Sequence, residues 1–176
     1  MIKRIKNFLT KEDKTFIKDT VLFANIPYYL NSYTVKDKTI KDLNNYFFCH
    51  TIIMRPEYRK EFLFNSEHYQ NFLSIVNNAF KKLKIKPKKY FRMSLNLNFN
   101  NGVESCPKHK DHDFKHKTLI VYLNDGDDNS FTCIKEKNKI KKIKPKKYEA
   151  VLFNDNLHWM FNPKKGIRLV LVTTFI

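Results

Sequence analysis

The second half of the chain carries a succession of strand patterns, and this feature constrains the fold more than any other. In residues 90–99 apolar and polar side chains alternate strictly, and the polar face holds Arg92, Ser94, Asn96 and Asn98. A period of two is typical of a strand whose apolar face packs against a core. The polar face therefore meets either water or a pocket.

Further strand patterns follow without a helical pattern between them, and turns rich in Asn, Asp, Gly or Lys separate them. They cover residues 117–124, 130–134, 140–143, 148–153 and 168–176. Short strands at regular intervals predict a β-sandwich or barrel. Lysine-rich residues 135–147 are expected to span a hairpin.

The first half predicts two helices that pack on one side of the strands. Thr10 is a candidate N-cap for a short helix that ends near Asp19. In residues 66–83 apolar side chains recur at three- and four-residue steps, which indicates an amphipathic helix capped by Ser66. Residues 21–35 look extended, and residues 46–54 are rich in β-branched and aromatic side chains and predict a strand.

Length and composition favour one domain in a reducing compartment. A chain of 176 residues, 42% of them hydrophobic, can bury a core without disulfides. Three cysteines in unrelated settings do not indicate a disulfide framework. No apolar run reaches the roughly 18 residues of a membrane span, and the first residues lack the apolar stretch of a signal peptide. We therefore expect a soluble, cytoplasmic protein with no membrane partner.

The net charge of the chain is compatible with a nucleic-acid partner but does not favour one. The formal net charge is +17, because 34 Lys and Arg residues stand against 17 Asp and Glu residues. Such an excess suits phosphate neutralisation. The lysines are scattered, however, and arginine, whose planar fork makes most specific phosphate and base contacts, is scarce. Abundant Lys, Asn, Ile, Phe and Tyr with only 3 Gly is also the residue usage of an AT-rich genome.

Histidines near the C-terminal strands support two metal-site hypotheses, of which the first is zinc. Cys106, His109, His112 and His116 lie within eleven positions and offer one thiolate and three imidazoles. On a helix only His112 and His116 would converge, and Pro107 does not suit a helix there. The spacing therefore gives zinc weak support.

The second hypothesis is iron. His109 and Asp111 are two positions apart, so at a strand end their side chains point to the same side. With His158 from a later segment, two imidazoles and one carboxylate leave open positions for a cosubstrate and O2, as in Fe(II) oxygenases. Arg168 lies ten positions beyond His158 and begins a strongly β-forming run. A charge in a buried strand is costly without a partner, which a bound carboxylate would supply.

Five features in this order resemble a known family: His109-Lys-Asp111, Thr118-Leu-Ile-Val-Tyr-Leu-Asn124, Pro145-Lys-Lys-Tyr-Glu-Ala-Val-Leu-Phe153, His158 and Arg168. The family is the Fe(II)/2-oxoglutarate-dependent oxygenases of the prolyl-4-hydroxylase-like branch, including short phage-encoded members. The resemblance implies a mainly β (α+β) double-stranded β-helix, or cupin-like jelly roll, with N-terminal helices packed on one sheet. It also implies a single oxygenase domain over residues 1–176, in which residues 1–89 support a catalytic core of residues 90–176.

The resemblance also implies roles for individual residues. His109, Asp111 and His158 would bind Fe(II). Arg168 would pair with the distal carboxylate of the cosubstrate 2-oxoglutarate, and Tyr122 would donate its hydroxyl to the same carboxylate. Two weaker candidates for this pocket are Thr118 and Asn96. With O2 as the other cosubstrate, such an enzyme hydroxylates a C–H bond.

Departures from the family pattern bear on the substrate. The family's Gly-Gly-x-Thr turn is here Asp127-Asp128-Asn129-Ser130, and the glycine of its Pro-x-x-Gly strand is Tyr148. A second arginine of the nucleic-acid demethylases would fall on Thr174, which weakens that branch. A peptidyl side chain, proline first, is the favoured substrate. A nucleic acid and a small metabolite remain alternatives, as does a non-catalytic, basic jelly-roll binding protein.

Overall fold

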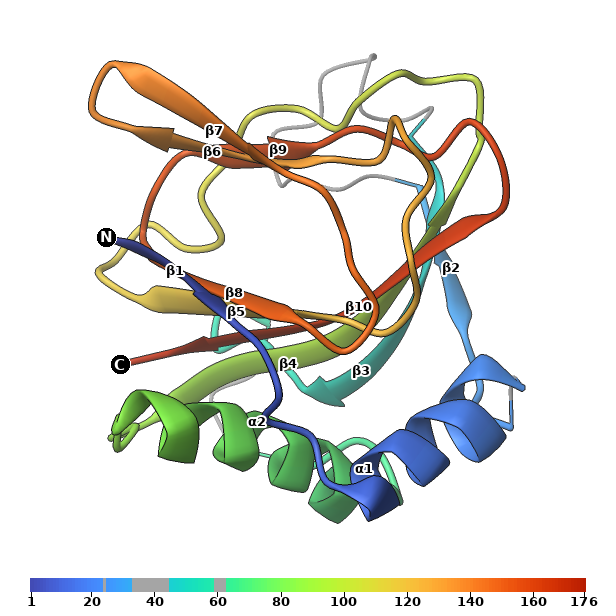
Figure 1. Cartoon of the computed structure of the whole chain (residues 1–176), viewed down its shortest axis with the longest axis vertical. Helices are drawn as coiled ribbons and strands as arrows, with labels where there is room; N and C mark the ends of the chain where they lie inside the picture. Colours follow the sequence, from blue (N-terminus) through green and yellow to red (C-terminus); the bar gives the residue numbers. More distant parts are fainter. Residues whose placement is uncertain (24, 33–44, 59–62) are drawn as a thin grey trace.

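The computed structural model describes residues 1–23, 25–32, 45–58 and 63–176, and within them the strands form two facing sheets (Figure 1). The large sheet has the order β1 (Ile2–Ile5), β8 (Ala150–Asn154), β5 (Lys117–Tyr122), β10 (Ile167–Phe175), β4 (Tyr90–Phe99), β3 (Phe47–Ile53) and β2 (Tyr29–Asn31). The small sheet has the order β7 (Lys139–Ile143), β6 (Thr132–Glu136) and β9 (His158–Met160). All the strand pairs in both sheets are antiparallel. This arrangement confirms the prediction of a mainly β jelly roll with helices on one sheet.

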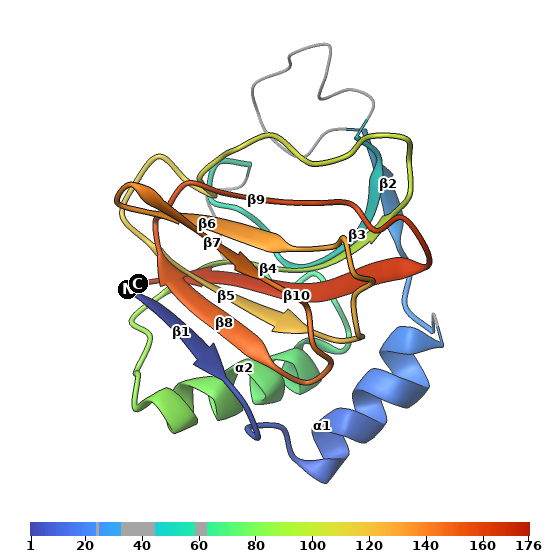
Figure 2. The same cartoon turned by 45° about the horizontal axis from the view of Figure 1, so that its top comes forward.

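The helices cover the outer face of the large sheet, away from the small sheet (Figure 2). Helix α1 (Lys11–Phe16) begins with a capping box in which Thr10 and Asp13 bond each other's backbone N–H, as the predicted cap requires. The predicted end at Asp19 is wrong, because the chain continues as a π-helical segment, η1 (Ile17–Leu22), to Leu22.

Helix α2 (Tyr69–Leu83) begins later than the pattern predicts. His68, not Ser66, occupies the N-cap position. Ser66 Oγ accepts the N–H of His68 at 3.2 Å and lies 2.8 Å from Nε2 of His50, so residues 66–68 form a turn that ties the helix to β3. The apolar stripe itself is confirmed, because Phe72, Val76 and the other buried residues of α2 belong to the main core.

Strand β4 divides the core from the space between the sheets. Met93 and Leu95 are fully buried in the core that packs against the helices. Arg92, Asn96 and Asn98 line a cavity on the opposite face. The alternation in residues 90–99 therefore has the predicted consequence, and its polar face meets a pocket.

The remaining strand predictions hold with shifted bounds. The expected hairpin is formed by β6 and β7 and covers residues 132–143, so it overlaps lysine-rich residues 135–147 and begins three residues earlier. The sequence did not predict β1, which pairs with β8, or β9, which pairs with β6. In residues 21–35 only β2 is a strand, Val21 and Leu22 are helical, and residues 24 and 33–35 lie outside the described ranges. None of the described helices is long and apolar enough to span a membrane.

Candidate active site

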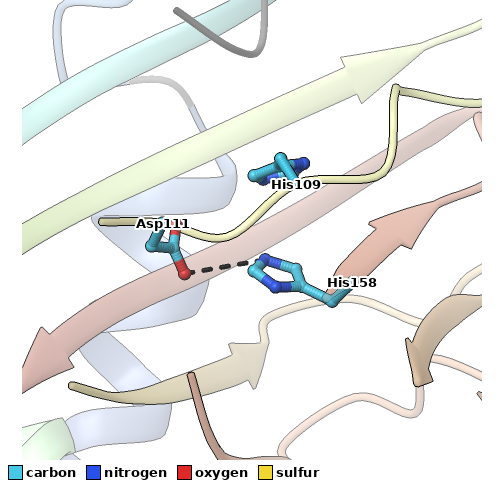
Figure 3. A group of neighbouring side chains, drawn as sticks. All are labelled: His109, Asp111 and His158. Carbon is cyan, nitrogen blue, oxygen red and sulfur yellow. Dashed lines mark ion pairs between the residues drawn. The ribbon is translucent and has the colours of Figure 1, made fainter. Parts of the chain in front are cut away.

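Three predicted metal ligands meet between the sheets (Figure 3). His109 and Asp111 lie on the segment before β5, and His158 begins β9. An isolated antiparallel bridge joins His109 to His158. One donor atom from each of the three side chains lies within 4.8 Å of the others. The structure therefore brings together two imidazoles and one carboxylate.

The protonation and orientation of these side chains fit a metal. Burial lowers the pKa of His109 to about 4, so this imidazole is neutral at neutral pH. Burial alone would raise the pKa of Asp111, but neighbouring positive groups hold it well below its usual range. Nδ1 of His109 lies 2.9 Å from the carbonyl oxygen of Pro107, and Nδ1 of His158 lies 3.0 Å from that of Asn156. If each Nδ1 carries the proton, both Nε2 atoms keep a lone pair for a metal.

Asp111 is held by three further side chains. Thr118 donates its hydroxyl to Oδ2 at 2.8 Å, and Nη1 of Arg92 lies 3.0 Å from Oδ1. Arg55, on the segment after β3, places Nη2 3.6 Å from Oδ1 and donates from Nη1 to the Asp111 carbonyl oxygen. Sequence reasoning placed Arg92 on the polar face of its strand but missed Arg55, since no pattern near position 55 indicated a site.

Arg168 lines the same cavity as the three candidate metal ligands. The residue is only 4% exposed, and burial lowers the pKa of its guanidinium. Nη2 donates to Thr132 Oγ1 at 2.9 Å and Nη1 to the Met160 sulfur at 3.3 Å, while Nε has no hydrogen-bond partner among the described residues. No carboxylate in the described ranges forms an ion pair with Arg168. A buried cation in this state suits a carboxylate ligand.

The other three candidates for the cosubstrate pocket, Asn96, Thr118 and Tyr122, lie in different places. Asn96 lines the cavity, and its side chain lies 3.0 Å from Ser94 Oγ. Thr118 contacts Asp111 and so lies at the metal end rather than beside Arg168. Tyr122 is fully buried, donates its hydroxyl to Thr132 Oγ1 at 2.8 Å and is not among the cavity's lining residues. Thr132, which links Tyr122 to Arg168, was missed, because a threonine in a strand is unremarkable.

The zinc alternative does not assemble. His112 contacts Glu57 at 2.6 Å through Nδ1 and Thr174 at 2.8 Å through Nε2. His116 Nδ1 lies 2.8 Å from the Phe114 carbonyl oxygen. Among the described residues, the only cluster of three or more candidate ligands is His109, Asp111 and His158.

A second, larger cavity of about 290 Å3 adjoins the first. The two share Phe47, Arg92, His109 and Asp111 as lining residues. Two of the candidate metal ligands, His109 and Asp111, therefore line both cavities, and His158 lines the smaller one. Such an arrangement can bring two bound molecules to one metal. Neither cavity is lined by a residue of the hairpin segment 135–147.

Similar proteins are found by structure and not by sequence. No protein-family model matches the sequence, and no curated protein matches it. An oxidoreductase of the 2OG-Fe(II) oxygenase family from Burkholderia pseudomallei matches with a TM-score of 0.75 and 10% identity, over 99% of this chain and 84% of that one.

Two prolyl hydroxylases match over the same share of this chain. One is a prolyl hydroxylase from Trichoplax adhaerens, which matches with a TM-score of 0.70 and 15% identity over 83% of its own chain. Its structure is a complex with a peptide fragment of the hypoxia inducible factor oxygen degradation domain. The viral collagen prolyl hydroxylase of Paramecium Bursaria Chlorella virus-1, in a 2OG complex, has a TM-score of 0.63, 15% identity and 94% covered. The chain therefore has the fold of the 2OG-Fe(II) oxygenases, as the sequence resemblance implies.

Proposed function

We propose that this protein is an Fe(II)- and 2-oxoglutarate-dependent dioxygenase that hydroxylates a C–H bond. One observation carries the proposal. The ligand set of His109, Asp111 and His158 lines a cavity that is also lined by the buried Arg168. A metal site and an unneutralised cation on the wall of one cavity suit a dicarboxylate that chelates the metal with one of its ends. The fold shared with 2OG-Fe(II) oxygenases supports the same conclusion.

Each residue has a role that follows from its contacts. His109, Asp111 and His158 would hold Fe(II), and Thr118 would orient Asp111 through its hydrogen bond. Arg168 would bind the distal carboxylate of 2-oxoglutarate.

The remaining candidates would support the cosubstrate. Tyr122 would act on the carboxylate through Thr132, because its hydroxyl is already bonded to that residue. Asn96 would line the cosubstrate cavity.

Iron and 2-oxoglutarate, when bound, supply the oxidising chemistry, in which 2-oxoglutarate and O2 are consumed and an oxygen atom enters a C–H bond. The chain supplies orientation and a dry cavity. Ile120, Val170 and Val172 line the cosubstrate cavity with apolar surface, and Trp159 adds a largely buried aromatic wall. Exclusion of water strengthens the electrostatic interactions inside the site.

A peptidyl side chain of prolyl type is the substrate we favour. The Trichoplax prolyl hydroxylase, which has the same fold, is bound to a peptide fragment. A small metabolite or a nucleic acid remains an alternative substrate. The net positive charge of the chain is the sole feature that favours a nucleic acid. We further propose that residues 1–176 act as one oxygenase domain, because strands from residues 1–89 lie in the same sheet as strands from residues 90–176.

An anaerobic titration of the Fe(II)-loaded protein with 2-oxoglutarate tests the proposal. We expect a visible charge-transfer band, followed by succinate formation when O2 is admitted. Both should be lost in His109→Ala and retained in Arg4→Gln, because Arg4 pairs with Glu149 outside both cavities. No band in an iron-loaded protein, together with salt-sensitive binding to DNA, would favour the alternative of a non-catalytic, basic jelly-roll binding protein.

A further inference from the structure

Two arginines face the larger cavity beside the candidate metal ligands. Arg55 and Arg92 both line this cavity, and both approach the same oxygen of Asp111, at 3.6 Å and 3.0 Å. Their side chains are 21% and 12% exposed, so both guanidinium groups are largely withdrawn from water. Two largely buried cations thus share one carboxylate that is itself a candidate metal ligand.

The other charged groups of this cavity are already engaged or exposed. Glu57 contacts His112 at 2.6 Å. Lys110 lies at the surface, 3.6 Å from Asp155, and Asp113 is exposed. Among the described residues, Asp111 therefore pairs with both guanidinium groups, and Glu57 interacts electrostatically with that of Arg55.

Charge balance in the loaded site leaves a positive excess. The two charges of 2-oxoglutarate offset those of Fe(II). The carboxylates of Asp111 and Glu57 then offset two of the three guanidinium groups that line the cavities, those of Arg55, Arg92 and Arg168. One positive charge remains in a largely buried region, where an unpaired charge is costly. A metal bound to Asp111 would also compete with Arg55 and Arg92 for the negative charge of this carboxylate.

We propose that the substrate carries an oxyanion, a carboxylate or a phosphate, which Arg55 and Arg92 bind in the larger cavity beside the reacting carbon. This inference rests on the proposed function, because it concerns the substrate of the same site. The planar forks of the two guanidinium groups suit either oxyanion. In a peptide the group would be an acidic side chain or a C-terminal carboxylate, and in a metabolite an acid or a phosphate ester.

A different role would give the arginines no part in substrate binding. They would only hold Asp111 in place, and the larger cavity would then show no preference for anions. The two hypotheses, anion binding and a purely structural role, differ only in whether the larger cavity prefers a negatively charged molecule. The test therefore needs probes that match in size and differ in charge.

The experiment uses protein loaded with Mn(II), which reports distance through paramagnetic relaxation and does not turn over. In the presence of saturating 2-oxoglutarate, acetate, acetamide and inorganic phosphate are titrated separately, and the relaxation of their proton or phosphorus signals is measured by NMR. We expect acetate to be relaxed more strongly than acetamide. Tighter binding of phosphate than of acetate would identify a phosphate-bearing substrate, and the reverse order a carboxylate.

Variants assign the effect to the arginines. Arg55→Gln should weaken acetate binding about 10-fold or more, as expected for one charge-assisted hydrogen bond. Arg55→Lys should give an intermediate loss, because it keeps the charge without the fork. Arg4→Gln is the matched control, since Arg4 also pairs with a buried carboxylate, that of Glu149, but lies outside both cavities. It should bind acetate as the unmodified protein does.

Equal relaxation of acetate and acetamide would overturn the inference, and so would unchanged acetate binding in Arg55→Gln. Failure of the proposed function has a separate signature. Addition of 2-oxoglutarate would then leave the water-proton relaxation of the Mn(II) protein unchanged before any probe is added.

Discussion

His109 and His158 are joined by two backbone hydrogen bonds, in which each residue donates its N–H to the other's carbonyl oxygen at 2.9 Å. Their ring centroids lie 4.5 Å apart. Because backbone groups set this spacing, the two imidazoles do not depend on each other or on a metal for their positions. The segment before β5 and strand β9 thus form a preorganised half of the site, and Asp111 completes it from the same segment.

We therefore expect His109→Ala to lose metal binding without losing the fold. The backbone bridge to His158 does not involve the removed ring, while the ligand set loses one of its three members. Affinity for Mn(II) or Zn(II), measured by calorimetry, should fall about 100-fold or more. Urea unfolding of the metal-free variant should stay close to that of the unmodified protein. Unchanged metal affinity would contradict the site.

Asp111→Ala should behave differently, because it leaves two guanidinium groups without their carboxylate. Arg55 and Arg92 are largely buried, and an uncompensated buried charge costs about 3–5 kcal/mol. The free energy of unfolding of metal-free protein should fall by about that amount in urea titrations. Asp111→Ala/Arg92→Met should recover part of the loss. A fall no larger than that of His109→Ala would show that the two ion pairs contribute little.

Arg168→Met should change stability and cosubstrate binding in opposite directions. Without 2-oxoglutarate the guanidinium is a buried cation with no ionic partner among the described residues, so its replacement should raise the free energy of unfolding by about 1–3 kcal/mol. Affinity for 2-oxoglutarate should fall about 100-fold, because two charge-assisted hydrogen bonds are lost.

Arg4→Met gives the contrasting control for Arg168→Met, since it removes the closer of the two cations, Arg4 and Lys6, that pair with the buried Glu149, and it should destabilise. Chemical unfolding and calorimetry provide the two measurements. A destabilised Arg168→Met with intact 2-oxoglutarate binding would mean that Arg168 is structural.

The parts of the site that the sequence predicts are those whose position depends on neighbouring residues in the chain. The alternation in β4 follows from the two-residue period of a strand, so Asn96 could be assigned to the polar face before any partner strand was known. The separation of His109 and Asp111 likewise fixed their common direction. Arg168 stood out because its charge conflicts with the apolar strand in which it lies.

The parts that could not be predicted depend on contacts distant in sequence. Arg55 reaches Asp111 across 56 positions, from a segment that has no periodicity of its own. Strand β9 has three residues and is defined by its pairing with β6, so too few positions exist for a pattern. The hydroxyl of Tyr122 donates to Thr132 on β6, and only the pairing of the small sheet places that strand beside it.

Thr118→Val should weaken the metal site with little change in shape. The threonine is fully buried, and its hydroxyl donates to Oδ2 of Asp111 at 2.8 Å. Loss of an outer hydrogen bond to a metal ligand typically lowers metal affinity by about 10-fold or more. Calorimetric titration with Mn(II) measures this, with Thr173→Val as the control, because Thr173 is equally buried and its hydroxyl has no hydrogen-bond partner in the described ranges. Equal affinities in the two variants would contradict the role of Thr118.

Asp13→Ala should destabilise the fold far more than its place in a short helix suggests. Its carboxylate accepts hydrogen bonds from the Thr10 N–H at 3.0 Å and, across the helix interface, from Ser74 at 2.9 Å and Asn78 at 2.8 Å. Since the residue is only 4% exposed and its carboxylate accepts all three hydrogen bonds, removal of the carboxylate abolishes them together, and the free energy of unfolding should fall by about 2–4 kcal/mol. Thr10→Ala, which removes only the cap, should cost about 1 kcal/mol. Similar urea midpoints for the two variants would mean that Asp13 acts as a cap alone and does not join α1 to α2.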